Sequence, residues 1–256
     1  MKKYLFLLLC LMLLPAGLPA ADRPVVRFDQ GHGQAFRIDQ QGSLHLTDFA
    51  RLLLDLGAVA ETGKAPLDRV LADQPRALVL SGVFQPLSAE ELDAVVRFVE
   101  QGGRLAVMLH IAPPVGSLLH RLGVNFSNGV VREQEGVLGG DALNFRVTRL
   151  AKHPLFTGVD AFNLYGGWAL NPADDRSRII ARTGPRAWVD LNGDRRLSRG
   201  DAMQSFAVVV TGRRGKGEFV IFADDAIFQN RFLAGNRHLA ENLARWLLGL
   251  PTGPSA

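Results

Sequence analysis

The side chains best suited to chemistry in this sequence follow short apolar runs that are typical of strands. They comprise two histidines, three aspartates, a serine and a glutamine. In open α/β sheets, ligands bind at the carboxyl ends of the strands, so these groups could share one rim. Imidazole and carboxylate groups from separate strand ends could form a metal site or an acid/base pair. The predicted ligand-binding residues are Asp29, Gln30, His32, Ser81, His110, Asp224 and Asp225.

Other interpretations of these residues stay open. Asp29 and His32 lie in a glycine-rich turn, where they could hydrogen-bond to the backbone instead of a ligand. Asp224 and Asp225 precede Ala-Ile-Phe and could cap a short helix. His110 precedes two prolines, and a single imidazole in such a turn is commonly a satisfied structural group. A shared site therefore requires that the side chains converge.

A second chemical motif is the segment 190–201, DLNGDRRLSRGD. It has oxygen side chains at loop positions one, three, five, nine and twelve, and a backbone carbonyl at seven. This is the oxygen spacing that a seven-coordinate calcium ion needs. The segment resembles the calcium loops of EF-hands and dockerins, although an acidic turn between two strands is the alternative. The predicted calcium ligands are Asp190, Asn192, Asp194, the Arg196 carbonyl, Ser198 and Asp201.

This calcium loop departs from the usual pattern at two positions. Arg195 stands at the sixth position, where glycine normally makes the tight turn, and a left-handed arginine costs roughly 1 kcal/mol. Asp201 replaces the longer glutamate that usually coordinates through both oxygens. Millimolar calcium outside the cytoplasm would still suit such a weak site. We expect a structural Ca²⁺ that braces a loop, and no organic cofactor is predicted.

Cysteine-based catalysis is excluded by composition. The one cysteine, Cys10, lies in the apolar N-terminal segment. A glutaminase needs a thiolate on a sharp strand-to-helix turn, with a histidine and a carboxylate behind it. Ser81 lies at a strand end, but Leu-Ser-Gly-Val is not the G-x-S-x-G pattern of a nucleophile elbow. No catalytic residue is therefore assigned.

The elements that must position these groups are clearest in the segment 77–110. Residues 77–80 and 105–109 are continuous apolar runs, which favour strands buried on both faces of a parallel sheet. Between them, apolar residues recur at helical spacing, Ser88 with Glu91 forms a capping box, and Gly102-Gly103 ends the helix. This strand–helix–strand unit predicts an α/β fold.

The rest of the chain predicts one domain over residues 22–250, followed by a short tail at 251–256. Residues 25–28 form a further predicted strand. Residues 125–141 are glycine-rich and weakly patterned, which favours loops with an excursion at the sheet edge. Apolar runs at 206–210 and 218–222, joined by a basic glycine-rich loop, predict a C-terminal antiparallel hairpin.

The N-terminus predicts export. A charged start, the apolar run 4–14 and small residues up to position 21 are typical of a secretory signal peptide at 1–21, and the run is too short to span a bilayer. We therefore expect a periplasmic or secreted bacterial protein without a membrane span after cleavage. The net charge of +4 includes Lys2 and Lys3, and the other basic residues are dispersed, so no nucleic-acid partner is predicted.

Several short motifs occur in an order that resembles one family. They are FDQGHG at 28–33, LSG at 80–82 with SAEE at 88–91, Gly102-Gly103, GKGEFVIFADDAIF at 215–228 and NLARW at 242–246. Together they resemble the class I glutamine-amidotransferase-like domain of gliding-motility components, intraflagellar-transport subunits and exported bacterial proteins of unknown function. The resemblance implies a flavodoxin-like fold, a mostly parallel sheet with helices on both faces, and it does not imply glutaminase chemistry.

Three functions from different classes remain open. The leading one is a non-catalytic exported domain that binds a small molecule, a glycan or an envelope protein at the carboxyl edge of its sheet. The second is a metal-assisted hydrolase that uses the Asp and His side chains. The third is a structural module of an envelope complex, braced by its calcium loop. Convergence of the histidines and aspartates on one point would favour the hydrolase.

Overall fold

The computed structural model describes residues 23–253, so the predicted signal peptide and the last residues of the tail lie outside the described part. The predicted strand–helix–strand unit forms as expected, as β3 (Ala77–Ser81), α3 (Ala89–Glu100) and β4 (Arg104–Met108). Ser88 and Glu91 make the predicted capping box: the Glu91 N–H donates to Ser88 Oγ at 3.2 Å, and the Ser88 N–H donates to Glu91 Oε2 at 2.8 Å. The helix ends before Gly102, whose φ is +118°.

One half of the large sheet is parallel, with strands in the order β2-β1-β3-β4-β15. Its central strands are almost fully buried, as continuous apolar runs require. Because all five strands point the same way, their carboxyl ends meet at one edge. The strands are β1 Val25–Asp29, β2 Val59–Gly63, β3 Ala77–Ser81, β4 Arg104–Met108 and β15 Gly217–Phe222.

The other half of this sheet is antiparallel. The predicted hairpin is present as β14 and β15, and from β14 the sheet continues through β10, β5 and β12 to β13, with β11 and β8 branching from β14. These strands are β5 Val124–Arg132, β8 Arg149–Leu150, β10 Trp168–Pro172, β11 Ser177–Arg182, β12 Trp188–Val189, β13 Ala202–Met203 and β14 Ala207–Arg214.

The flavodoxin-like prediction is therefore wrong. Seven of the eleven strand pairings in the 12-stranded sheet are antiparallel, so the sheet is mixed and largely antiparallel. The main cause is the segment expected to be loops, which forms the nine-residue strand β5. Asn125, Ser127 and Asn128 give this strand little apolar pattern, and its pairing with β10 and β12 decides its conformation.

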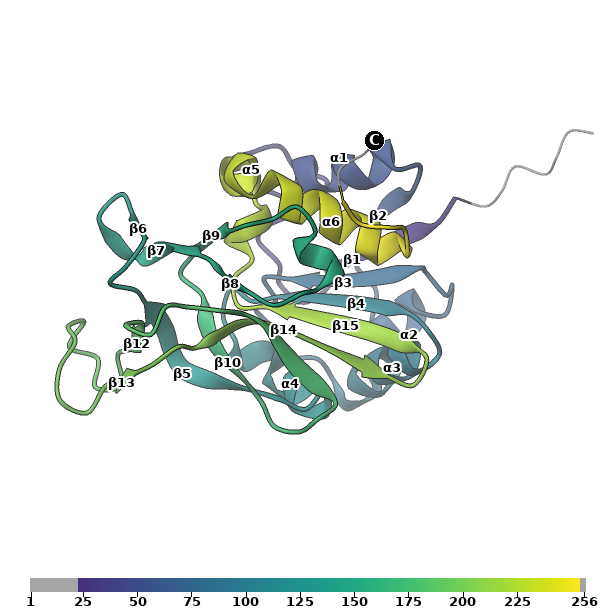
Figure 1. Ribbon diagram of the computed structural model, residues 1–256. Helices are drawn as coiled ribbons and strands as arrows, with labels where there is room; N and C mark the ends of the chain where they lie inside the picture. The colour runs from purple at the N-terminus through teal and green to yellow at the C-terminus, as the bar shows by residue number, and fades with distance from the viewer. Residues whose placement is uncertain (1–22, 254–256) are drawn as a thin grey trace, which may run out of the picture.

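Helices cover both faces of the parallel half, whereas α4 packs on β5 of the antiparallel half. In Figure 1, α1 and α6 lie together on one side of these strands and α3 lies on the other. The αL residue Gly249 ends α6, as the C-cap position favours. The helices are α1 Thr47–Asp55, α2 Leu67–Val70, α3 Ala89–Glu100, α4 Gly116–Arg121, α5 Asn230–Leu233 and α6 Arg237–Leu248.

Two hairpins extend beyond the antiparallel half, at the left of Figure 1. One belongs to a second sheet of three strands, β6 Val137–Leu138, β7 Asp141–Val147 and β9 Phe162–Tyr165. The other pairs β12 with β13 at the end of the large sheet. Its turn is the 12-residue segment 190–201, so the calcium-loop motif lies at the outer end of this hairpin.

Candidate functional site

The carboxyl edge of the parallel half brings two predicted residues into contact. β4 and β15 are paired neighbours in parallel register, with Met108 opposite Phe222, and the Asp225 N–H donates to the Leu109 carbonyl at 2.8 Å. His110 and Asp225 therefore leave adjacent strands side by side. His110 Nδ1 lies 3.2 Å from Asp225 Oδ1. The Asp225 side chain is fully buried, whereas that of His110 is 41% exposed.

The electrostatics of this pair follow from burial and from the contact itself. The hydrogen bond with Asp225 raises the pKa of His110, although burial acts against it. Burial raises the pKa of Asp225, and the hydrogen bond to His110 acts against this rise. The neighbouring Asp224 is also buried, and burial followed by repulsion from Asp225 raises its pKa to about 8. Two adjacent carboxyl groups thus share a site poor in solvent, beside the His110 imidazole.

Aromatic rings frame the His110 imidazole. The ring centroids of Phe36 and Phe84 lie 4.8 and 5.3 Å from that of His110 and 6.5 Å from each other. The indole N–H of Trp168 donates to the His110 carbonyl oxygen at 3.1 Å. Phe84 is 37% exposed, which makes it the one phenylalanine among the exposed large hydrophobic residues of the described chain. The imidazole is thus flanked by two phenylalanine rings and is still partly exposed to solvent.

Unpartnered polar atoms occur at the carboxyl ends of three of the parallel strands. Among the described residues, five buried side-chain nitrogen or oxygen atoms have no hydrogen-bond partner, and the three oxygens are Gln30 Oε1, Ser81 Oγ and Asp225 Oδ2. Gln30 directly follows β1, and Ser81 is the last residue of β3, the parallel neighbour of β1. Buried polar atoms are nearly always satisfied, so three exceptions at one edge of the sheet set this edge apart from the rest of the described core.

Gly82 permits this close packing. Its φ is +58°, and a Cβ on it would lie 2.7 Å from Asp225 Oδ2 and 3.0 Å from the Phe36 ring. Only glycine takes this conformation readily and leaves that space open. The backbone after β3 therefore passes directly beside the Asp225 carboxyl group.

Asp29 and His32 form a separate buried cluster. His32 Nδ1 lies 2.8 Å from Asp29 Oδ2, and His32 Nε2 lies 3.0 Å from Glu91 Oε1. The Gln34 amide also donates to Asp29 Oδ2, and Gln34 Oε1 accepts from the His32 N–H at 2.8 Å. All four side chains are buried. Both ring nitrogens of His32 are thus engaged within the protein.

Glu91 makes this cluster a structural junction. Its carboxylate accepts the Ser88 N–H within the capping box and also the Leu67 N–H, at 3.0 Å, at the start of α2. The hydrogen bond with Asp29, followed by the Asp29 charge and the Glu91 contacts, raises the pKa of His32 to about 9 against the opposing effect of burial. The sequence showed Glu91 as a cap but gave no sign of its ion pair with His32.

The predicted rim residues therefore divide. One set lies at the edge around His110 and Asp225 and also includes Gln30 and Ser81. The Asp224 carboxylate is turned to the backbone instead, where it accepts the Tyr165 N–H at 2.6 Å and the Ala226 N–H at 2.9 Å. The backbone joins the two clusters, because the Phe84 and Gln85 N–H groups both donate to the His32 carbonyl at 3.0 Å. Phe36 and Phe84 carry no sequence signal that would have placed them beside His110.

The segment 190–201 brings three of its predicted calcium ligands close together. Asp190, Asp194 and Asp201 each offer a carboxylate oxygen, and these oxygens lie within 4.8 Å of one another. Asp190 Oδ2 accepts the Arg195 N–H at 2.7 Å, and Arg195 has the left-handed φ of +61° expected at the sixth position. The donor set consists of oxygens alone, which fits a hard cation such as Ca²⁺.

No helix within residues 23–253 is long and apolar enough to span a bilayer.

Comparison with solved structures shows similarity at the level of the fold. The chain is similar to the mmIFT52 N-terminal domain, with a TM-score of 0.69 and 13% identity over 87% of this chain and 97% of the other. It is also similar to a putative ThuA-like protein from Bacteroides uniformis, with a TM-score of 0.53 and 14% identity over 91% and 95%. A cytoplasmic protein of Salmonella typhimurium LT2 gives a TM-score of 0.54 and 17% identity over 90% and 100%.

These likenesses partly confirm the resemblance drawn from the motifs, since an intraflagellar-transport domain is among the similar folds. No curated protein matches the sequence. The family described as "Domain of unknown function (DUF4350)" matches residues 41–244. This range includes Glu91, His110 and Asp225, whereas Asp29 and His32 lie before it. The chain therefore belongs to the DUF4350 family.

Proposed function

We propose that this protein is a binding domain whose ligand site is the carboxyl edge around His110 and Asp225. The observation that carries the proposal is the half-exposed His110 imidazole, which Asp225 holds at 3.2 Å and which the Phe36 and Phe84 rings frame. The imidazole can accept or donate a hydrogen bond, so the ligand should carry hydroxyl or amine groups. The Phe36 and Phe84 rings offer apolar faces for the ligand's carbon framework.

A small sugar or a related polyol combines these features, because its hydroxyl groups donate and its C–H faces pack on aromatic rings. The proposal includes a class I glutamine-amidotransferase-like ancestry without glutaminase activity, since no cysteine occurs in residues 23–253. It also places the protein in the bacterial periplasm or outside the cell, on the strength of the signal-like N-terminus.

We further propose that the loop 190–201 binds a structural Ca²⁺. Asp190, Asp194 and Asp201 would hold the ion, with Asn192, Ser198 and the Arg196 carbonyl completing the oxygen set. The ion would offset the mutual repulsion of three clustered carboxylates and fix the outer end of the β12–β13 hairpin. It would take no part in chemistry at the carboxyl edge.

The binding proposal is tested by thermal unfolding and calorimetry with a panel of neutral monosaccharides and disaccharides, with glycerol as a small polyol control. We expect at least one sugar to raise the unfolding temperature of the wild type. Phe84→Ala and His110→Ala should abolish that shift. His238→Ala, which alters an exposed histidine on α6, should keep it. If no sugar shifts the wild type, or if the shift survives in both Phe84→Ala and His110→Ala, the proposed site is wrong.

A second candidate function, hydrolysis, is favoured by one observation. Asp225 holds a half-exposed histidine through Nδ1, and this is how a carboxylate orients a general base. The same variants separate the two functions. A hydrolase would turn over model ester or glycoside substrates with a rate that falls by roughly 10²–10⁴ in His110→Ala. A binding domain would show no turnover in the wild type.

A further inference from the structure

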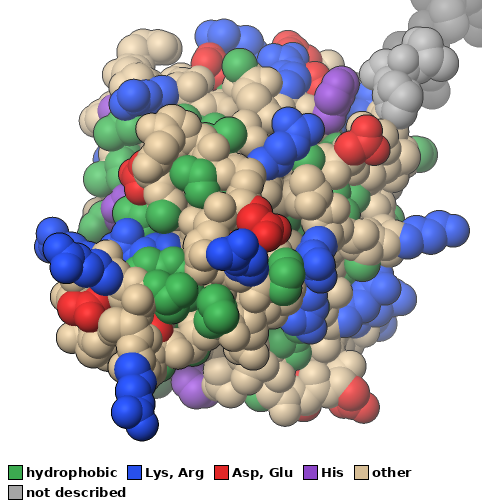
Figure 2. Space-filling model, turned by 60° about the vertical axis from the view of Figure 1, so that its left-hand side comes forward, with side chains coloured by type: hydrophobic (Ala, Val, Ile, Leu, Met, Phe, Trp, Pro, Cys, Tyr) green, Lys and Arg blue, Asp and Glu red, His purple; other side chains and the backbone are tan. Residues whose placement is uncertain are grey.

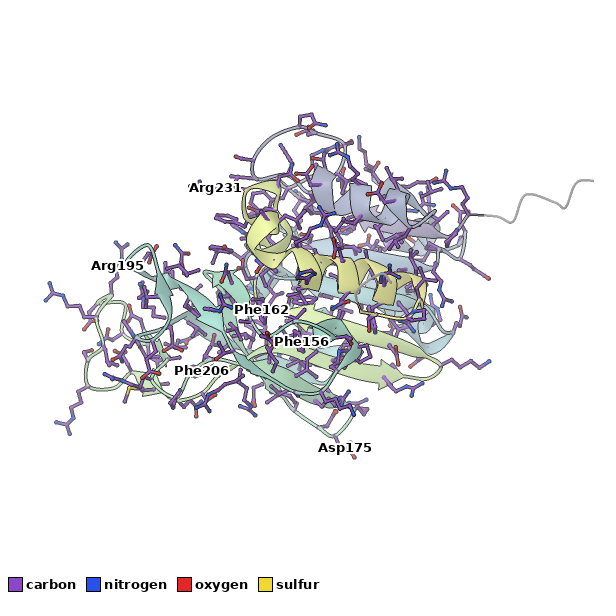
Figure 3. The ribbon with its side chains drawn as sticks, turned by 45° about the horizontal axis from the view of Figure 1, so that its top comes forward. Phe156, Phe162, Asp175, Arg195, Phe206 and Arg231 are labelled. Carbon is purple, nitrogen blue, oxygen red and sulfur yellow. The ribbon has the colours of Figure 1, made fainter. Side chains whose placement is uncertain are left out.

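The hairpin that ends in the calcium-loop motif has an unusual surface composition. We call residues 182–203 the hairpin tip: the end of β11, the turn that follows it, β12, the loop 190–201 and β13. It extends beyond the main body at the left of Figure 1, and Figure 3 labels Arg195 near this outer end. A protruding element of this kind can meet a flat partner before the rest of the molecule does.

Large apolar side chains are exposed on the hairpin tip. Leu191, Leu197 and Met203 are 46%, 44% and 55% exposed. These three are among only seven large hydrophobic residues exposed in the described chain, and they fall within a span of 13 positions. Two of them lie in the loop itself, where no packing on the main sheet explains an apolar choice. An exposed apolar cluster that is rimmed by polar residues marks an interaction surface.

The charges on the hairpin tip are asymmetric. Five arginines stand against three aspartates between residues 182 and 203. The aspartates are turned toward the backbone of the loop, as in the contacts of Asp190 with the Gly193 and Arg195 N–H groups and of Asp201 with the Leu191 N–H.

The arginines on the outside of the loop, by contrast, are free. Within the described chain, the guanidinium groups of Arg195, Arg196 and Arg199 make no hydrogen bond or ion pair, and all three residues are exposed. Figure 2, which turns this side of the molecule forward, shows Lys and Arg side chains next to hydrophobic ones. The hairpin tip, with five arginines against three aspartates, therefore presents guanidinium groups and apolar surface together.

We propose that the hairpin tip docks on a bilayer that contains anionic phospholipids. Guanidinium groups bind phosphate oxygens in a bidentate manner, and leucine and methionine side chains between them can enter the boundary of the acyl chains. The combination is what a lipid surface requires, because it offers phosphate and hydrocarbon at adjacent depths. A nucleic acid would leave the exposed leucines without a partner. The docking is peripheral and involves no membrane span.

The test is sedimentation with vesicles of phosphatidylcholine alone or with added phosphatidylglycerol. The chain from Asp22 onward is used, since it contains every described element and lacks the apolar run 4–14, which could bind lipid by itself. We expect retention on the anionic vesicles, little on the neutral ones, and release at 1 M salt, where the Debye length falls to about 3 Å.

Matched variants locate the contact. Arg196→Gln should weaken vesicle binding by about five-fold, because one basic residue near an anionic surface contributes about that much. Leu197→Ser should weaken binding by a similar factor, because one leucine would no longer be partly buried in the bilayer. The controls are Arg97→Gln on α3 and Leu54→Ser on α1, where the Leu54 side chain is 48% exposed. Both variants should bind the vesicles as the wild type does. Equal binding to neutral vesicles, or equal loss in the controls, overturns the proposal.

The calcium arm of this experiment bears on a different question. The loop 190–201 alone has three arginines and three aspartates, so it is formally neutral, and a bound Ca²⁺ would make it cationic. If the proposed calcium site exists, 2 mM calcium should strengthen anionic vesicle binding relative to a chelator. Binding that is insensitive to calcium would count against the calcium site and leave the lipid docking in place.

Discussion

His32 and Glu91 form a buried ion pair, with Nε2 and Oε1 3.0 Å apart, that ties the loop after the first strand to the first turn of α3. Since Glu91 also accepts backbone N–H groups of Ser88 and Leu67, one carboxylate joins three segments that are far apart in the sequence. The pair with Asp29 on the other side of the imidazole completes the junction. This histidine stabilises the wall of the candidate site without belonging to it.

Removing the imidazole should destabilise the fold strongly. In His32→Ala, the carboxylates of Asp29 and Glu91 would stay buried without their cationic partner. Breaking a buried pair in this way costs about 3–5 kcal/mol. Urea unfolding should therefore show a markedly lower free energy of unfolding, whereas His238→Ala on the surface of α6 should change it by less than about 0.5 kcal/mol. A loss below about 1 kcal/mol for His32→Ala would contradict the junction.

The same histidine predicts how stability depends on pH. The pKa of His32 is raised from 6.5 to about 9, so its contribution is fully present below pH 6.5 and is lost as the pH rises through 9. Glu91 behaves oppositely, because its lowered pKa gives stability that is lost under acid conditions. Urea unfolding of the wild type and of His32→Gln between pH 6 and pH 10 should show a difference that shrinks at the alkaline end. A constant difference would argue against an imidazolium.

Glycine at position 82 can be tested against a matched glycine. Gly139 has nearly the same φ, +61°, but a Cβ there would meet no atom within 4 Å. Gly139→Ala should cost about 1 kcal/mol for the backbone conformation alone. Gly82→Ala should cost more, by roughly 1–3 kcal/mol, because the methyl group would be forced against Asp225 and Phe36. Equal losses in chemical denaturation would show that the space beside Asp225 is not needed.

Substitutions in the loop 190–201 should be able to raise as well as lower its affinity for calcium. Isothermal titration should detect binding at millimolar calcium in the wild type and none in Asp190→Asn, which removes a carboxylate of the cluster. Asp201→Glu should tighten binding, because the longer side chain can coordinate through both oxygens. Asp175→Asn, an exposed residue outside the loop, should leave the titration unchanged. No heat and no thermal shift with any of these proteins would rule the site out.

The sequence predicted the elements with strong local signals and missed those set by pairing. The capping box of Ser88 and the apolar period of α3 are local, and both are confirmed. Strand β5 carries polar residues and glycine, so only its two neighbours define it. This one strand extends the sheet beyond the hairpin and makes most of its pairings antiparallel. The residues of β5 alone could not have predicted this strand.

The candidate site shows the same division. Polar residues directly after apolar runs were enough to predict that His110 and Asp225 lie at one edge, although the order of the strands was not predicted, and the two side chains are in contact. The partners from loops could not be predicted. Phe36 and Phe84 reach His110 from separate turns, and Glu91 reaches His32 from a helix cap. These contacts depend on tertiary geometry that no spacing in the chain expresses.

The position of β15 has a consequence for how the protein can assemble. This strand is formed by residues 217–222, yet it lies against β4, which ends at residue 108. A chain that emerges from its N-terminus must leave the outer edge of β4 unpaired until more than a hundred further residues have appeared. Such an open edge is a template for aggregation, and closing it late makes folding slow. The parallel half of the sheet can therefore close only after residues 217–222 have been made.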